Sequence, residues 1–170
     1  MRAEDTARLD KPHQIPIMLG CAFAVRKDFF ENIGQYDEGL LIWNGEQIEL
    51  SFKLHLCGGN LVEVPCSRMN HMFRSHHRNH QLDGVDVAAR NFKRVAEVWL
   101  DDFKEVMYQT DPKRRAIDAG DLTKARSIKE RLNCKPFRYF LEEIAPEMYV
   151  RYFYQLDYPG KMKLSHLHKF

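Results

Sequence analysis

A turn broken by glycine and followed directly by an apolar-periodic helix constrains this chain most. The stretch runs from Ile42 to Phe52 and reads IWNGEQIELSF. Gly45 permits a sharp backbone path, and Glu46 lies where a first-turn carboxylate meets the positive end of a helix. The pattern predicts a helix to Leu56, with a core side formed by Ile48, Phe52, Leu54 and Leu56.

Two interpretations of Trp43 are open at this point. The turn could present the tryptophan side chain, or Trp43 could be a buried core residue before an ordinary capped helix. From the spacing alone the buried interpretation is favoured, because such patterns usually form core.

Composition limits the class of protein. The chain has 170 residues, of which 44% are hydrophobic and 12% aromatic, enough to bury one sizeable core. A formal charge of +2 does not indicate a nucleic-acid partner, because phosphate binding needs a concentrated basic face. No apolar run is long enough to span a bilayer, and the first residues, MRAED, do not resemble a signal. We therefore expect no nucleic acid and no membrane contact by this segment.

The first third of the chain predicts alternating strand and helix. Residues 1–14 are polar and are interpreted as an edge or loop, and the apolar run 15–25 is predicted to be a buried strand. A short helix over 29–34 ends at a glycine. A second strand over 61–65 ends at a proline. This order predicts an α/β layer with its site at strand ends.

The later residues predict helices. Apolar residues, with Asn91 among them, recur at three and four positions from Val85 to Val106, and this helix is interpreted as scaffold that ends before Asp111. Further helices are predicted over 122–132 and 137–144. The tail 151–170 shows no clear period.

A polar segment over 67–84 holds four His and three Arg. A loop this long inside a compact domain is more often functional than not. Its composition favours a metal ligand together with cationic groups that hold an anion such as a diphosphate. His71 is the favoured ligand, because it follows a predicted strand and a short turn that can aim it. For His76 and His80 a solvated loop position is favoured.

The four cysteines, Cys21, Cys57, Cys66 and Cys134, lack the paired spacing of a structural zinc site. Taken alone they are as compatible with free thiols as with disulfides, because the compartment decides between them.

From about Ile17 to Tyr149 the chain resembles the polypeptide N-acetylgalactosaminyltransferases. The resemblance depends on the order of several motifs: LGCAFAV, YDEGLLIWNGEQIELSF, LCGGNLVEVPCSR, HMFRSHH, VAARNFKRVAEVWLDDFK and NCKPFRYFLE. It implies an α/β fold that is the second half of a Rossmann-like GT-A glycosyltransferase domain, with C-terminal helices. The domain portion would cover 15–150, with a polar edge at 1–14 and a tail at 151–170. The Gln-x-Trp repeats of the family's lectin domain are absent.

The resemblance also implies roles for single residues. Trp43 matches the tryptophan of the catalytic turn that contacts the leaving diphosphate, and Glu46 matches the carboxylate near sugar and acceptor. His71 matches a ligand of Mn²⁺, whose other protein ligands come from an Asp-x-His pair that does not occur upstream here. Gly20 and Cys21 match positions beside the donor sugar.

In the loop that follows, Phe73 would flank the acceptor peptide, and Arg74 and His77 would close over the diphosphate. Some residues depart from the family pattern. Asn44 replaces a glycine, Gln47 replaces an asparagine, and Cys21 stands where many members have a second glycine. Arg78 and Asn79 stand where Pro-Tyr is common, and the following Pro-Gly-Gly is missing.

The implied function is part of a retaining transferase that moves GalNAc from UDP-GalNAc to Ser or Thr of polypeptides, in the Golgi lumen, with a membrane anchor upstream. This chain alone would be inactive without the nucleotide-binding half. The alternative is an inactive or truncated paralogue that binds or scaffolds. The secretory compartment implied by the resemblance leads us to predict a Cys57–Cys134 disulfide, an unpaired Cys66 and a buried thiol at Cys21.

Overall fold

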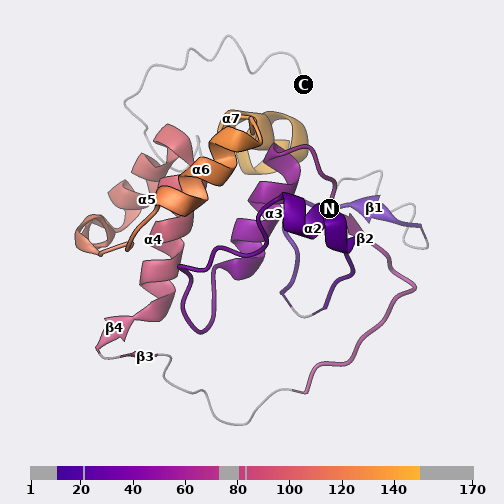
Figure 1. Cartoon of the computed structure of the whole chain (residues 1–170), viewed down its shortest axis with the longest axis horizontal. Helices are drawn as coiled ribbons and strands as arrows, with labels where there is room; N and C mark the ends of the chain where they lie inside the picture. The colour runs from indigo at the N-terminus through magenta and orange to yellow at the C-terminus, as the bar shows by residue number, and fades with distance from the viewer. Residues whose placement is uncertain (1–10, 21, 73–80, 83, 150–170) are drawn as a thin grey trace.

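The computed structural model describes residues 11–20, 22–72, 81–82 and 84–149 (Figure 1). The predicted edge up to residue 10, the tail 151–170 and the site residues Cys21, Phe73, Arg74 and His77 lie outside the described residues. The elements are β1 His13–Gln14, α2 Lys27–Asn32, α3 Glu46–Leu56, β2 Val62–Glu63, β3 Gln81–Leu82, β4 Val85–Asp86, α4 Val87–Trp99, α5 Lys104–Thr110, α6 Thr123–Arg131 and α7 Phe137–Tyr139.

The helix α3 is the centre of the packing. Figure 1 shows it between α2 and α4, and every residue from Glu49 to Leu56 is buried. Phe52 and Leu56 join a core cluster with α4 and the C-terminal helices. Leu50 and Leu54 join a second cluster with α2. The predicted core side is therefore confirmed, but the helix is buried on its other sides as well.

The helix predicted from Val85 to Val106 is wrong as one continuous element. α4 ends at Trp99, and a 3-10 turn over Asp101–Phe103 leads into α5. Asp101 has a left-handed φ of 47°. Its carboxylate accepts hydrogen bonds from Lys129 Nζ at 2.6 Å and from the backbone N–H of Phe137 at 2.7 Å. These tertiary contacts compensate for the break, and periodicity cannot reveal them.

The other predicted helices are confirmed with small shifts at their ends. α2 is followed by Gly34 at φ 84°, which matches the glycine stop. α6 lies within the predicted 122–132. α7 continues into a π-helical turn, Phe140–Ile144, which together cover the predicted third helix. The rings of Phe137 and Phe140 each lie across Phe52, with centroids 5.1 and 4.9 Å away.

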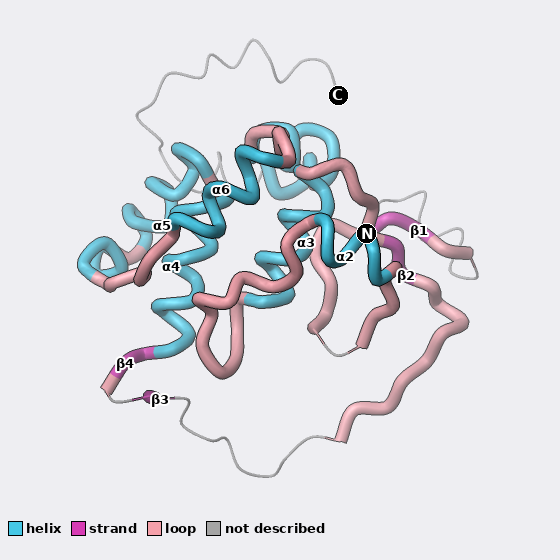
Figure 2. Tube along the Cα trace, in the orientation of Figure 1, coloured by secondary structure: helices cyan, strands magenta, loops and turns pink. Residues whose placement is uncertain are grey.

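The strand predictions are only partly right. Residues 22–26 form no strand, and Phe23 and Val25 are exposed, so the predicted buried strand over 15–25 is wrong there. Within 61–65 only β2 forms, and it pairs antiparallel with β1 (Figure 2). β3 pairs with β4 in the same way. Among the described residues no wider sheet covers these segments. Val62, Val64, Leu82 and Val85 are therefore exposed, whereas Leu61 is buried against α2 and α3.

A disulfide joins Cys57, directly after α3, to Cys134, just before α7. Beside it the backbone N–H of Lys135 donates to the carbonyl of Leu56 at 2.8 Å. The predicted pair is therefore confirmed, and so is the prediction that Cys66 is free, since its thiol is exposed and unbridged. The bridge fixes the C-terminal end of α3 to the C-terminal helices.

We expect the Cys57→Ser/Cys134→Ser double variant to lose stability. The bridge links positions 77 residues apart. In the chain-entropy description, closing a loop of that length raises the free energy of the unfolded chain by about 4.5 kcal/mol at 25 °C. Urea unfolding followed by far-UV circular dichroism measures the loss. Cys66→Ser is the matched control and should leave the transition midpoint unchanged. Equal midpoints for the double variant and the wild type would contradict the assignment.

Candidate active site

The turn before α3 has an unusual backbone. Ile42, Asn44 and Gly45 have positive φ angles of 41°, 78° and 99°, and the N–H of Trp43 donates to the carbonyl of Leu41 at 2.5 Å. Glycine adopts such angles freely and asparagine tolerates them, but for a β-branched isoleucine they are strained. Strain of this kind persists only where the surroundings impose it, and it clusters at functional sites.

The turn presents its apolar side chains to solvent. Trp43 is 53% exposed and Ile42 is 64% exposed. The buried interpretation of Trp43 is therefore wrong, and Trp99, at 1% exposure, is the buried tryptophan of α4. An exposed indole on a strained turn can contact a ligand face directly.

Glu46 is the first residue of α3 and is half-buried at its N-terminal end. The amide nitrogen of Gln47, in the orientation that lets it donate, lies 3.2 and 3.3 Å from the two Glu46 carboxylate oxygens. Burial, and then the negative charges of Glu46 and Glu49, raise the pKa of Tyr36. The phenol of Tyr36 therefore stays protonated, and the donor beside the Glu46 carboxylate is the amide of Gln47.

Two polar side chains of α3 hold the segment that leads to Gly20. The backbone N–H of Met18 donates to Ser51 Oγ at 3.1 Å, and His55 Nε2 lies 2.9 Å from the carbonyl oxygen of Ile15. Both α3 residues are buried, at 0% and 3% exposure. The path of this segment is therefore set by α3.

Gly20 lies against the first turn of α3. A Cβ atom there would meet Gln47 Cβ at 3.2 Å, closer than most such contacts, so a side chain at this position would press on the residue after Glu46. The structure thus brings Gly20 next to the turn that precedes α3.

His71 lies on a different part of the chain, in the exposed segment that follows β2. Its imidazole is a possible metal ligand. In the parts of the chain that the structure describes, no group of three or more His, Cys, Asp or Glu side chains could hold a metal ion. The described residues therefore fit the role of supplying one ligand and not a complete site.

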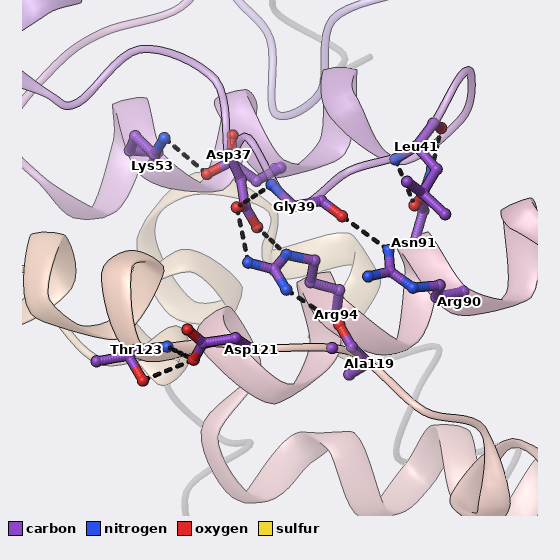
Figure 3. Close-up of polar contacts among 12 residues, drawn as sticks. Asp37, Gly39, Leu41, Lys53, Arg90, Asn91, Arg94, Ala119, Asp121 and Thr123 are labelled. Atoms are coloured by element: carbon purple, nitrogen blue, oxygen red, sulfur yellow. Dashed lines mark hydrogen bonds and ion pairs between the residues drawn. The ribbon is translucent and has the colours of Figure 1, made fainter.

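The loop over 37–44 lies along one face of α4 (Figure 3). Arg94 donates through Nη2 to Asp37 Oδ1 at 2.9 Å, and Arg90 Nη1 donates to the carbonyl of Gly39 at 2.7 Å. Asn91, between them, bonds the turn itself. Sequence reasoning missed these residues and interpreted the helix as scaffold. The signal in the sequence was the pair of Asn91 and Arg94, two polar residues three positions apart on an otherwise apolar helix face.

A buried ion pair was also missed. Glu49 and Lys53 are each 1% exposed, and Lys53 Nζ lies 2.7 Å from Glu49 Oε1. The same ammonium donates to the carbonyl of Gln35 at 2.6 Å. Burial raises the pKa of Glu49, and the Lys53 charge opposes this shift. The pair attaches the loop before residues 41–45 to α3.

Several known proteins are similar to this chain, although no protein-family model matches it. N-acetylgalactosaminyltransferase 4 of Drosophila melanogaster is 47% identical over 151 residues, which are 88% of this chain and 23% of that protein. Polypeptide N-acetylgalactosaminyltransferase 10 of Homo sapiens is 45% identical over 134 residues, or 79% of this chain and 22% of that protein. A crystal structure of GalNAc-T7 with UDP, GalNAc and Mn²⁺ has a TM-score of 0.78 at 37% identity and covers 89% of this chain and 28% of that one.

The fold is that of part of a GT-A glycosyltransferase domain, with helix and strand in the arrangement of the GalNAc-T7 structure. With its sequence identity to several members, the chain belongs to the polypeptide N-acetylgalactosaminyltransferase family. It spans about a quarter of the length of the relatives that it matches. In the described residues no helix is long and apolar enough to cross a membrane.

We expect acidification to loosen the attachment of the 15–18 segment through His55. Burial lowers the pKa of His55 from its usual 6.5, against the opposing effect of backbone hydrogen bonds. The unfolded chain therefore binds this proton first, so the stabilising contribution is present above about pH 6.5 and is lost as the pH falls toward the lowered pKa. Urea unfolding at a series of pH values between 7.5 and 5 measures the slope.

The His55→Gln variant should have a flatter pH dependence than the wild type, because it keeps an amide donor for the Ile15 carbonyl but does not titrate. His71→Gln removes an exposed histidine and is the matched control. If the wild type and His55→Gln lose stability in parallel on acidification, His55 is not the titrating group.

Proposed function

We propose that the intact enzyme, meaning this chain with a nucleotide-binding half, transfers GalNAc from UDP-GalNAc to Ser or Thr hydroxyls of polypeptides. The observation that carries the proposal is the strained turn that exposes Trp43 directly before Glu46 at a helix N-terminus. Its support is the similarity to transferases of this activity and to a structure that contains UDP, GalNAc and Mn²⁺.

In this reaction the bond from the anomeric carbon of GalNAc to the diphosphate breaks, and its electron pair stays with UDP. The acceptor hydroxyl gives its proton to an oxygen of the leaving diphosphate, and its oxygen bonds to that carbon with retained configuration. Trp43 would contact the leaving diphosphate with its exposed indole. Glu46 would accept hydrogen bonds from sugar or acceptor hydroxyls, with its charge favoured by the helix N-terminus. Gly20, without a side chain, would leave room for the sugar, and Cys21 would lie beside it.

His71 would be this chain's ligand to Mn²⁺, and the remaining ligands would come from outside the described residues. When bound, the metal would neutralise charge on the diphosphate. Arg74 and His77 would close over the same group, where cationic donors oppose the charge that develops on the leaving oxygen. Phe73 would flank the acceptor peptide.

The extent of the domain and its compartment can also be inferred. The portion over 15–150 would be the C-terminal part of the catalytic domain, between an edge at 1–14 and a tail at 151–170. The Cys57–Cys134 bridge supports an oxidising compartment, and the Golgi lumen is the one we infer, because disulfides persist in the secretory pathway. Its partners would be UDP-GalNAc and polypeptides with Ser or Thr.

We expect substitutions in the loop to reduce turnover of the intact enzyme in a set order. His71→Ala should abolish Mn²⁺-dependent transfer. Arg74→Ala should lower turnover by about 100-fold, the loss typical of one preorganised donor to a developing anion. His77→Ala should lower turnover less, because an imidazole is partly neutral near pH 7. Transfer of radiolabelled GalNAc to a Thr-rich peptide measures the rates. His80→Ala is the control on the same loop. Full activity of His71→Ala would refute the metal assignment, and a scaffold protein would show no transfer at all.

We expect this chain by itself to bind UDP weakly or not at all. Its described residues supply at most part of a metal site, and the proposed uridine pocket belongs to the nucleotide-binding half. Isothermal titration of the folded 170-residue chain with UDP and Mn²⁺ is the measurement. Micromolar affinity would show that the chain carries a nucleotide site of its own.

A further inference from the structure

One side chain of α4 bonds the backbone of the turn at several points. Asn91 of α4 is 0% exposed. Its Oδ1 accepts from the N–H of Leu41 at 3.0 Å. Its Nδ2 donates to the carbonyls of Leu41 at 2.7 Å, Trp43 at 3.2 Å and Asn44 at 2.7 Å. One carboxamide thus contacts the backbone on both sides of the strained Ile42.

These contacts need an amide in particular. The oxygen faces a donor and the nitrogen faces three acceptors, so the orientation of the Asn91 amide is determined by its partners. Aspartate would set an oxygen against three carbonyls, and a leucine of similar size would remove the acceptor for the N–H of Leu41 and the donor to the carbonyls of Trp43 and Asn44. The carbonyls of such a turn point inward, where neither helix nor strand can pair them.

The approach of the turn to α4 is close. A Cβ on Gly45 would lie 3.1 Å from Asn91 Cβ, so the backbone just before Glu46 rests on this residue. The neighbouring Arg90 and Arg94 bond the chain further back, at Gly39 and Asp37. Asn91 is therefore the member of this face that bonds residues 41–44.

We propose that Asn91 is a positioning residue for the transfer reaction: it holds the left-handed turn that sets Trp43 and Glu46, and it acts through them without touching substrate. The inference rests on the proposed function for its catalytic consequence. Its structural part, the imposed conformation of the turn, can be tested without activity.

Asn91→Ala in the intact enzyme should lower kcat by about 100-fold, the scale on which a displacement near 1 Å acts at an active site. The KM for UDP-GalNAc should change much less than kcat, because Trp43 would contact the diphosphate mainly as it leaves, while the uridine would be bound by the nucleotide-binding half. Because an unfolded fraction would also lower the apparent kcat without changing KM, kcat is expressed per folded molecule, with the folded fraction measured by circular dichroism.

Asn91→Asp provides the pH signature. At pH 7, where its carboxylate has no donor, this variant should have a kcat as low as that of Asn91→Ala. Its kcat relative to the wild type should rise on acidification, because the protonated carboxyl regains a donor. Val98→Ala is the matched control, since it removes a buried side chain seven residues further along α4, about 10 Å away. It should lower stability and leave kcat and its pH profile unchanged.

Hydrogen exchange of the peptide over 40–45, followed by mass spectrometry, is the second measurement. Exchange at Leu41 should accelerate in Asn91→Ala and stay at the wild-type rate in Val98→Ala. If Asn91→Ala fails to fold, Asn91→Ser, which replaces the amide by one hydroxyl that cannot donate to three carbonyls, takes its place. Unchanged exchange, or a loss of kcat equal to that of Val98→Ala, overturns the inference. An inactive wild type would overturn the proposed function instead, and the exchange rates would still decide the role of Asn91.

Discussion

The burial of α3 on all sides from Glu49 to Leu56 is the constraint on which the rest of the structure depends. A helix with apolar residues on two sides can join two clusters, but it then also buries the polar residues between them. Each buried polar group must find a partner, because an unpaired one costs free energy comparable to a lost hydrogen bond. In α3 these partners are mostly backbone atoms of neighbouring loops. Ser51, Lys53 and His55 bond the segments at Met18, Gln35 and Ile15.

The need for partners therefore determines where the loops run. The segment that carries Gly20 is attached to α3 by Ser51 and His55, and the loop before the catalytic turn is attached by Lys53. These loops have little regular structure of their own, and Figure 2 shows them as irregular paths against the helices. Hydrogen bonds from polar residues of a core helix thus fix the paths of these loops, as strand pairing fixes the path of the chain in a wider sheet.

This dependence explains which features could be predicted from the sequence. Helix α3 and the extent of α6 follow from local periodicity, so they could be read directly. The partner of Ser51 is 33 residues away and that of His55 is 40 residues away, and no local pattern contains that information. The break at Asp101 was missed for the same reason, since Lys129 and Phe137 stabilise it.

The candidate site shows the same limit. That a turn with Trp43 and Glu46 precedes α3 could be predicted, and the resemblance added their proposed roles and the Cys57–Cys134 pair. Whether Trp43 is buried could not be decided, because its exposure depends on α4, which follows more than 40 residues later. Asn91 was counted as part of an apolar stripe, although a carboxamide at a buried helical position must have polar partners.

Both ends of α3 are fixed, by different means. At the C-terminal end a covalent bridge joins Cys57 to Cys134. At the N-terminal end Asn91 holds the turn next to Gly45 through hydrogen bonds. Between them lie 11 residues, a rigid length of about 16 Å. A carboxylate such as Glu46, at the first position of a buried helix fixed at both ends, has little freedom to shift, whereas the same residue on a loop would depend on that loop's motion.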